Sequence, residues 1–426
     1  MTESFPFIEI VDGELNLPGD KSISHRAVMF SSLAKGTSKI INLSNGHDVK
    51  STISCLRELG VQIKEYKTSV LIQGKGFNGL TKSYKPLDAG NSGTTTRLIS
   101  GILITQNFES KIIGDQSLSR RPMKRIIIPL SEMGGIIQST PNYTLPIKIF
   151  PAENLKAINY ELPVASAQVK SAILLAGLHI EDVTTVIERT PSRDHTERML
   201  GLSVEKKDGK KFISVSKKNY PEAKEYLIPS DISTASFFIV FTLLCKNGNL
   251  VIKNVSMNET RTGIITILKK MGGDIQFVNL RTVANEPMGD IVVKNSKLVN
   301  TEIDEQIIPN IIDEIPILAV AGLFAEGDFH IKNVEELRGK ESDRISAICY
   351  NMKQLGLDVE EFSNGFSFNG EIKVSSPTFE SFNDHRIAMA FAILSMLLPD
   401  GGKVNHFDCV SISNPDFMEQ IRTIIR

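Results

Sequence analysis

The chain has 426 residues, of which 41% are apolar and 23% charged, and its formal net charge is −1. This length gives room for two domains with full cores, and the composition is that of a globular protein. A net charge so near zero provides no general attraction to nucleic acid or to a membrane surface, so an anionic ligand would need local cations. No apolar stretch is long enough to cross a bilayer.

The amino terminus and the cysteines bear on location. The first ten residues are acidic and lack the apolar run of a signal peptide. The four cysteines stand far apart and form no CxxC pair, which favours neither a disulfide framework nor a metal cluster. We therefore expect a cytoplasmic protein without a bound metal.

An internal repeat sets the predicted architecture. Its two clearest copies are Leu17–Ile63 and Ile228–Ile275. Each contains a polar cap, an apolar helix, a glycine turn, a strand, a second helix, a second glycine and a strand. Gly36 corresponds to Gly248 and Gly60 to Gly272, at one offset of about half the chain. Weaker copies begin near Asn91, Ser166, Asp313 and Asn383.

The repeats predict an α/β fold of six βαβαββ-like modules of about 70 residues each. Six such modules cannot enclose one core, so we expect two similar lobes of three modules. Turn-forming signals at 18–20 and 229–231 mark the change of lobe. Because the first signal comes so early, the opening strand is assigned to the C-terminal half. The predicted lobes are residues 1–18 with 231–426, and residues 19–230, joined by a two-strand hinge with the active site in the cleft between them.

Each module's first predicted helix begins with small polar or charged residues. The six starts read K-S-I-S-H-R, N-S-G-T-T-T-R, S-A-Q-V-K-S, S-D-I-S-T-A-S, I-D-E-I-P and N-D-H-R. Such residues are ordinary N-caps, but helix N-termini also present free N–H groups that suit phosphates and carboxylates. Basic residues occur at these starts: Lys21, Arg26, Arg97, Lys170 and Arg386. If the helices point to one place, they would form a cage for polyanions.

The run Leu337–Ile345, L-R-G-K-E-S-D-R-I, stands at the head of an apolar-periodic segment. On a helix, Lys340 and Arg344 are neighbours on one face with Glu341 beside them. Two stacked cations call for an anion between them, and the carboxylate is at hand for proton transfer. The alternative is a solvated helix face with one Glu–Arg pair.

Two other patterns lead nowhere. Gly74–Gly79 matches G-x-G-x-x-G, but no helix pattern follows it, so we interpret it as a turn. The sequence contains neither a P-loop pattern nor a histidine pair at metal-ligand spacing.

The longer motifs carry a resemblance over the whole chain. They read L-P-G-D-K-S-I-S-H-R, D-A-G-N-S-G-T-T-T-R-L, G-D-Q-S-L-S-R-R-P-M, S-A-Q-V-K-S-A, S-R-D-H-T-E-R-M-L, D-E-I-P-I-L-A-V-A, K-E-S-D-R-I and N-D-H-R-I-A-M-A. The sequence resembles the EPSP synthases, or 3-phosphoshikimate 1-carboxyvinyltransferases, of the enolpyruvyl transferase family. The resemblance implies two inside-out α/β barrels, no cofactor and a monomer. It also implies transfer of the enolpyruvyl group of phosphoenolpyruvate to the 5-hydroxyl of shikimate 3-phosphate, with release of phosphate, on the pathway to chorismate and the aromatic amino acids.

The resemblance also assigns roles to residues. Shikimate 3-phosphate would be bound by Lys21, Ser22, Arg26, Ser166, Gln168, Ser192, Asp313 and Lys340. Phosphoenolpyruvate would be bound by Lys21, Gly93, Arg121, Gln168, Arg344 and Arg386. Asp313 would take the proton of the 5-hydroxyl, and Glu341 with Lys21 would handle the methylene proton.

The sequence departs from the family pattern at three places, and two alternatives stay open. Ile412 falls where many members have a lysine that reaches phosphoenolpyruvate, Gly339 replaces a larger apolar residue, and Glu336 stands where some members have asparagine. One alternative is a UDP-N-acetylglucosamine enolpyruvyl transferase, whose K-N pair and loop cysteine are missing here. The other is a catalytically silent substrate-binding relative.

Overall fold

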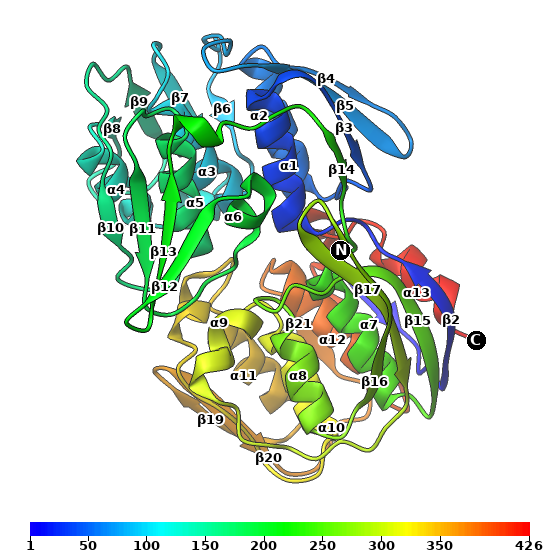
Figure 1. Ribbon diagram of the computed structural model, residues 1–426. Helices are drawn as coiled ribbons and strands as arrows, with labels where there is room; N and C mark the ends of the chain where they lie inside the picture. The colour runs from blue at the N-terminus through cyan, green and yellow to red at the C-terminus, as the bar shows by residue number, and fades with distance from the viewer. The chain divides into compact units, whose positions relative to one another are not determined.

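The structure, a computed structural model, describes residues 1–426, and the chain divides into two units (Figure 1). Unit 1 comprises Met1–Pro18, Pro229–Thr282 and Pro287–Arg426. Unit 2 comprises Gly19–Ile228 and Val283–Glu286. The four residues of Val283–Glu286, at the turn of a long hairpin, belong to unit 2, and no pattern in the sequence predicts this.

Unit 2 contains three four-stranded sheets with the same plan. Their orders are β14-β3-β5-β4, β6-β7-β9-β8 and β10-β11-β13-β12. In each sheet the first pair of strands is parallel and the other two pairs are antiparallel. The first module consists of α1 (Lys21–Leu33), β3 (Lys35–Ile41), α2 (His47–Glu58), β4 (Gln62–Glu65), β5 (Ser69–Lys75) and β14 (Glu225–Leu227). The second consists of β6 (Leu87–Asp88), α3 (Gly93–Leu103), β7 (Ser110–Ile113), η1 (Leu118–Arg120), α4 (Lys124–Glu132), β8 (Ile136–Gln138) and β9 (Ile147–Phe150). The third consists of β10 (Asn159–Glu161), α5 (Ala167–Gly177), β11 (Thr184–Glu188), α6 (His195–Leu200), β12 (Ser203–Lys207), β13 (Lys210–Val215) and η2 (Lys217–Asn219).

Unit 1 also contains three sheets, with orders β16-β17-β15-β2, β18-β20-β19 and β1-β22-β21. Its first module consists of β2 (Ile10–Asn16), α7 (Ile232–Leu244), β15 (Asn247–Ser256), α8 (Gly263–Lys270), β16 (Asp274–Val283) and β17 (Glu286–Lys294). The second consists of η3 (Glu305–Ile307), α9 (Ile308–Ile311), α10 (Ile315–Phe324), β18 (Phe329–Ile331), η4 (Glu335–Gly339), α11 (Arg344–Gln354), β19 (Asp358–Phe362) and β20 (Gly365–Asn369). The third consists of β1 (Glu3–Phe5), β21 (Thr378–Glu380), α12 (His385–Leu397), β22 (Gly402–Asn405), η5 (Phe407–Ile412) and α13 (Phe417–Ile424).

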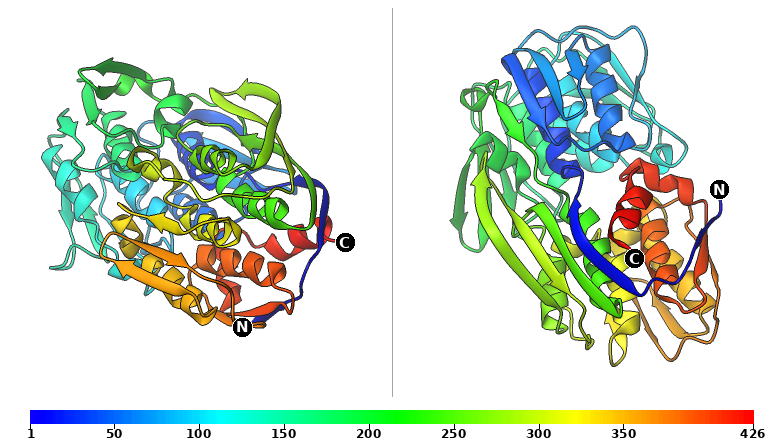
Figure 2. Two further views of the ribbon diagram at one scale, coloured as in Figure 1. Left: turned by 90° about the horizontal axis from the view of Figure 1, so that it is seen from below. Right: turned by 90° about the vertical axis from the view of Figure 1, so that its right-hand side faces the viewer.

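Two strands pair with partners that are distant in the sequence. β2 precedes α1 but lies parallel to β15, and β14 precedes α7 but lies parallel to β3. The amino-terminal strand β1 pairs with β22, and both termini lie in unit 1 (Figure 2). Each unit therefore completes one of its sheets with a strand that leads directly into the other unit's first helix.

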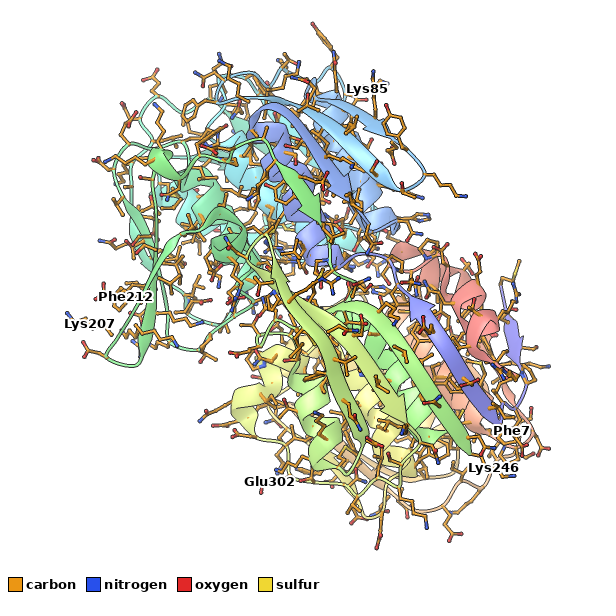
Figure 3. All side chains as sticks on the ribbon, turned by 45° about the vertical axis from the view of Figure 1, so that its right-hand side comes forward. Phe7, Lys85, Lys207, Phe212, Lys246 and Glu302 are labelled. Atoms are coloured by element: carbon orange, nitrogen blue, oxygen red, sulfur yellow. The ribbon has the colours of Figure 1, made fainter.

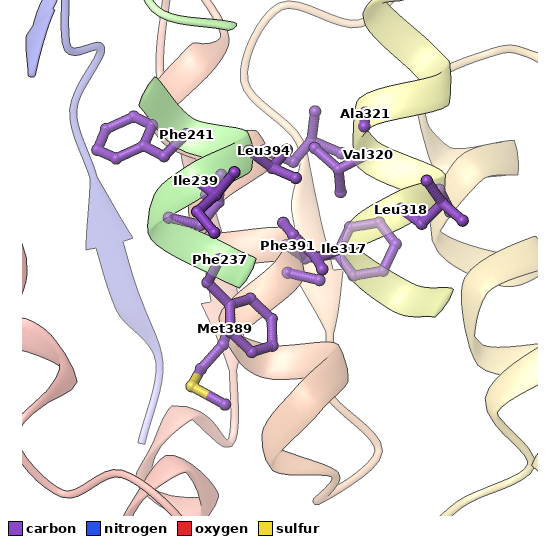
Figure 4. Packing of buried hydrophobic residues seen from close by; sticks show 14 of the residues in the cluster. Phe237, Ile239, Phe241, Ile317, Leu318, Val320, Ala321, Met389, Phe391 and Leu394 are labelled. Carbon is purple, nitrogen blue, oxygen red and sulfur yellow. The ribbon is translucent and has the colours of Figure 1, made fainter. Parts of the chain in front are cut away.

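The core of unit 1 is built on the first helices of its modules, α7, α10 and α12, which contact one another. Nearly every residue of these helices is buried, as expected of helices that are apolar all round. Phe237, Ile317 and Phe391 come from the three helices and are among the side chains that fill the space around them (Figure 4). The second helices of these modules, α8, α11 and α13, are amphipathic by comparison and bury only part of their residues.

The first helices of the six modules are α1, α3, α5, α7, α10 and α12. Five of these six helices begin with a residue whose side chain caps the helix. Asp20, Ser92, Ser166, Asp231 and Asp384 each accept a hydrogen bond from a backbone N–H of the first turn. The sequence prediction of polar helix starts is confirmed at these positions. The sixth helix, α10, begins without such a bond.

Two glycines of the repeat stand at equivalent turns. Gly60 and Gly272 come just after α2 and α8 with φ of +85° and +102°, a conformation that residues with a Cβ rarely adopt.

Edge strand β12 is exposed along its length and ends in Lys206 and Lys207, charges that discourage pairing with another chain (Figure 3).

One local prediction is wrong and one is confirmed. Lys340 has an extended backbone and α11 begins only at Arg344, so these two cations are not neighbours on a helix face. Asp343 ends the loop, because its carboxylate accepts from Ser346 N at 3.1 Å as the N-cap. The stretch Gly74–Gly79 leaves β5 as a turn with no helix after it, as predicted.

Candidate active site

In unit 2, the first two turns of α1 carry three of the predicted residues, Lys21, Ser22 and Arg26. Lys21 Nζ lies 2.9 Å from Asp48 Oδ2, and the side chains keep 18% and 10% exposure. Arg26 is almost fully buried and donates to Ser22 O at 2.9 Å. The start of α1 thus carries one partly exposed ammonium, that of Lys21, and one buried guanidinium, that of Arg26 one turn later.

Arg26, on α1 of the first module, donates hydrogen bonds to side chains from two helices of the third module, α5 and α6. Its Nε donates to Thr196 Oγ1 at 2.7 Å and its Nη2 to Ser171 Oγ at 2.7 Å. Burial lowers the pKa of Arg26 to about 10, although the charges of Glu197 and Asp20 oppose that shift. The side chain is therefore a cation at neutral pH, and both terminal nitrogens keep a second N–H for an anion.

The start of α3 lies against two guanidinium groups. A Cβ placed on Gly93 would come within 2.7 Å of Arg97 Nη1 and 3.6 Å of Arg121 Nη1. Arg97 donates to Gln168 Oε1 at 2.6 Å, and Gln168 Nε2 donates to Thr94 Oγ1 at 2.9 Å. The predicted residues Gly93, Arg121 and Gln168 therefore lie together, around the N-termini of α3 and α5.

A chain of polar side chains ties α1 to α3, and sequence reasoning missed it. His25 Nδ1 lies 2.7 Å from Thr52 Oγ1, which lies 2.7 Å from Thr95 Oγ1, which in turn donates to Ser92 Oγ at 2.7 Å. Burial first, then the charges of Lys21 and Arg26, lower the pKa of His25 well below its usual value. The imidazole is therefore neutral at neutral pH, so it adds no third positive charge to the start of α1.

Ser166 and Ser192 take different positions in the third module. Ser166 is the N-cap of α5, and its Oγ accepts from Val169 N at 3.4 Å. Ser192 follows β11 and donates from its hydroxyl to Glu188, a carboxylate that is 1% exposed. Both lie at the same end of the sheet as the helix starts, and both hydroxyls already take part in hydrogen bonds within the module.

Lys170 does not line an anion site, contrary to the grouping of cations by sequence. Its side chain has no exposure, and Nζ lies 3.1 Å from Glu188 Oε2 and 2.7 Å from Glu197 Oε1. An ammonium enclosed between two buried carboxylates serves the structure of the module. A charge at a helix start looks the same in sequence whichever way its side chain points.

In unit 1, Asp313 stands at the centre of the predicted cationic residues. Its carboxylate lies 3.3 Å from Arg344 Nη1, 3.9 Å from Lys340 Nζ and 3.8 Å from Arg386 Nη2. Arg386 also donates to the carbonyl oxygen of Asp313 at 3.0 Å. Three positive charges within 4 Å stabilise the ionised carboxylate, the form that accepts a proton. Glu314 is the N-cap residue of α10, so Asp313 is not needed as a cap.

Arg344 is the anchor of this cluster, with a side chain that is 1% exposed. It donates from Nε to Asp384 Oδ2 at 2.8 Å and from Nη2 to Glu341 Oε2 at 2.6 Å. Burial alone would lower the pKa of Arg344, but the charges of Asp384, Glu341 and Asp313 outweigh burial and raise it. Asp384, the buried N-cap of α12, belongs to the motif N-D-H-R-I-A-M-A, but nothing in the sequence indicates its role.

The loop residues Lys340 and Glu341 keep partial exposure, 21% and 16%. Lys340 Nζ also lies 3.1 Å from Glu336 Oε1. Nothing lies within 4 Å of a Cβ built on Gly339, so the loop has space for the larger residue of other family members. Ile412 is partly buried in η5 and packs on the core of unit 1.

The whole chain gives two negative findings. No single helix is long and apolar enough to cross a membrane, and only the sharply bent pair Glu305–Ile311 with Ile315–Phe324 meets that test, by length and composition alone. No three His, Cys, Asp or Glu side chains gather in a way that could hold a metal ion.

Comparison with known proteins gives the family. A model of the EPSP synthase (3-phosphoshikimate 1-carboxyvinyltransferase) family matches residues 8–421. The chain belongs to the EPSP synthase family. A 3-phosphoshikimate 1-carboxyvinyltransferase of Petrotoga mobilis is 48% identical over 98% of both chains. The match sets aside the alternative of a UDP-N-acetylglucosamine enolpyruvyl transferase.

Solved structures agree with this membership. The EPSP synthase of Acinetobacter baumannii superposes with a TM-score of 0.86 at 40% identity, covering 100% of this chain and 98% of its own. The enolpyruvyl transferase NikO of Streptomyces tendae, 14% identical, gives a TM-score of 0.74 over 99% and 97% and shares the fold. The predicted enolpyruvyl transferase fold class is confirmed.

Proposed function

We propose that this chain transfers the enolpyruvyl group of phosphoenolpyruvate to the 5-hydroxyl of shikimate 3-phosphate. The observation that carries the proposal is the cluster around Asp313, in which a carboxylate base lies among Lys340, Arg344 and Arg386. Membership of the EPSP synthase family supplies the substrates. Cations without a base would suit a binding protein equally well, whereas a base held among cations suits a reaction between anions.

The proposed reaction begins with addition. The Asp313 carboxylate takes the proton of the 5-hydroxyl while that oxygen bonds to C2 of phosphoenolpyruvate. The double bond of phosphoenolpyruvate takes a proton at its methylene carbon from Glu341, with Lys21 assisting. The product is a tetrahedral intermediate that carries a methyl group and still holds the phosphate.

Elimination completes the reaction. A proton leaves the new methyl group for Glu341, the double bond forms again, and phosphate departs from C2, taking up the proton that Asp313 removed from the 5-hydroxyl. The developing negative charge on the leaving group requires cations, a role that we assign to Arg121, Arg344 and Arg386. Arg344 keeps one N–H of its five for this purpose, because its other four are bonded to carboxylates.

We further propose that shikimate 3-phosphate contacts residues of both units, as the domain prediction from sequence requires. Lys21, Ser166 and Gln168 belong to unit 2, whereas Asp313 and Lys340 belong to unit 1. A ligand that binds both parts favours the state in which both can reach it. Small-angle X-ray scattering should then give a smaller radius of gyration with shikimate 3-phosphate than without it.

The deciding experiment is phosphate release by the purified protein with the two substrates together and singly. Release that requires both establishes the transferase. A protein that binds shikimate 3-phosphate but releases no phosphate would be the catalytically silent relative, and Ile412→Lys would then be the first substitution to try.

A further inference from the structure

The long hairpin of β16 and β17 is shared between the two units. Unit 1 contains its strands as far as Thr282 and again from Pro287, while the turn Val283–Glu286 belongs to unit 2. The sequence predicted two passages of the chain between the units, and nothing in the proposed reaction uses the two at this turn. The chain in fact passes between the units at four places, after Pro18, Ile228, Thr282 and Glu286.

The turn itself has a defined conformation. Ala284 and Asn285 have φ of +49° and +67°, and two consecutive residues with positive φ form the tight two-residue turn typical of hairpins. Glu286, the first residue after them, is only 2% exposed. Turns ordinarily lie in solvent, so an acidic side chain buried at a turn indicates that the turn rests on another part of the protein.

The turn rests on α6 of unit 2. Glu286 Oε1 lies 2.9 Å from Nδ1 of His195, the first residue of α6, and His195 has no exposure. Asn285 Nδ2 donates to the carbonyl oxygen of Arg198, further along α6, at 3.2 Å.

The buried contact between Glu286 and His195 favours a turn that stays in place. An imidazole nitrogen and a carboxyl oxygen form a hydrogen bond whether the pair is neutral or ionised. Separating two buried polar groups leaves each without a partner, which is costly. Movement of the turn away from α6 is therefore disfavoured.

The turn lies a short way along the sheet from the predicted hinge. Ser230, just after the second passage of the chain, forms a bridge with Val255 of β15, and Val255 pairs with Gly289 of β17. Glu286 stands three residues before Gly289, which is about 10 Å along an extended strand. Two connections leave two bodies free to rotate about the line that joins the connections, whereas a third attachment away from that line opposes the rotation.

We propose that the turn Val283–Glu286 is a strap which, fastened to α6 through Glu286, opposes rotation of the two units about the hinge. The strap limits how widely the ligand-free protein opens, without contact to any substrate. This role is independent of the proposed reaction, because neither Glu286 nor His195 has a part in that reaction.

The test measures distances between two spin labels in the ligand-free protein by pulsed electron paramagnetic resonance. The labels are attached at Lys85→Cys in unit 2 and Glu302→Cys in unit 1, both exposed positions, while the four native cysteines are buried. Glu286→Ala releases the strap, so it should widen the distribution of distances on the order of twofold. An unchanged width would overturn the proposal.

Two control variants show whether the hydrogen bond is responsible. Glu205→Ala makes the same chemical change on the exposed strand β12 and should leave the width as in the wild type. Glu286→Gln keeps an oxygen that can bond to His195, so its width should also stay near that of the wild type. A width as large as that of Glu286→Ala would mean that this hydrogen bond does not hold the turn, and would refute the proposal.

A second pair of labels shows whether unit 2 stays intact. With both labels in unit 2, at Lys85→Cys and Lys207→Cys, Glu286→Ala should give the same distribution as the wild type. If this distribution also widens, unit 2 itself has loosened and the strap is refuted.

Asn285→Gly decides the matter if Glu286→Ala does not fold. It removes only the bond to Arg198, and glycine suits the positive φ of the turn. It should widen the distribution between the units by a smaller factor than twofold. An Asn285→Gly protein with the wild-type width would then refute the strap.

Discussion

Replacing Arg344 by methionine should strongly destabilise unit 1. The change removes the guanidinium that bonds Asp384 at 2.8 and 3.2 Å and leaves that carboxylate, with no exposure, without its main counter-charge. Breaking a buried ion pair at one partner typically costs about 3–5 kcal/mol. Glu341 and Asp313 also lose a partner, but their 16% exposure lets water compensate part of the loss.

The assay is urea unfolding followed by far-ultraviolet circular dichroism, because the chain has no tryptophan. Arg422→Met, on the exposed face of α13, is the matched control and should stay within about 0.5 kcal/mol of wild type. The double variant Arg344→Met with Asp384→Asn should regain about 2 kcal/mol, since the amide has no charge to bury and can still cap α12. If the double variant is less stable than Arg344→Met, the buried charge is not the source of the loss.

Three further predictions concern turnover, substrate binding and pH. Asp313→Asn should lower kcat more than about a hundredfold while the Kd of shikimate 3-phosphate stays within about tenfold; unchanged kcat would remove Asp313 from the mechanism. Gly93→Ala should raise KM for phosphoenolpyruvate about tenfold, because its Cβ would displace Arg97, 2.7 Å away, from Gln168; an unchanged KM would show that the arginine moves freely. Burial, with the nearby lysine charge, lowers the pKa of His179 to about 4, so the unfolded chain binds a proton that the folded chain does not. Stability should therefore fall as the pH drops from about 6.5 toward 4, and His179→Gln should flatten the decline in Tm between pH 7 and 5; an equal decline would exclude His179 as its source.

The sequence predicted the architecture because the repeat has strong local signals. Gly60 and Gly272 mark equivalent turns, and capping residues such as Asp20 and Ser92 mark equivalent helix starts. These features act over a few residues, so a pattern in the chain translates directly into structure. The turn at Val283–Glu286 has no such signal, because contacts distant in sequence decide the unit to which it belongs.

The candidate site was predictable by residue and less so by geometry. Asp313, Arg344 and Arg386 do lie together, as the family motifs imply. The prediction of a helix that includes Lys340 was wrong, because the apolar periodicity on which it rested begins only after the N-cap at Asp343. Lys170 was grouped with the anion-binding residues because a sequence does not show whether a charged side chain points inward.

Sequence also missed the supporting partners. Asp48, Glu188 and Asp384 hold Lys21, Ser192 and Arg344, and each comes from another helix, strand or turn. Asp48 and Asp384 stand 27 and 40 residues from their partners, and Glu188 stands four residues before Ser192 at the end of a strand, so none of these pairs follows the period of a helix or strand. What sequence reveals best is the residue that touches a ligand, while the residue that holds it in place becomes visible only with the fold.

The pairing of β2 with β15 has a consequence for synthesis on the ribosome. The strand Ile10–Asn16 emerges first, yet its partner Asn247–Ser256 is made only after the whole segment Gly19–Ile228. Domains generally fold as they emerge, so unit 2 should fold while the opening strand still waits unpaired. Closing so long a loop is made easier when the intervening segment is already folded, because its ends are then held close together. A nascent chain halted after Gly19–Ile228 has left the ribosome, but before Asn247–Ser256 has done so, should therefore contain a protease-resistant unit 2 and a protease-sensitive amino terminus.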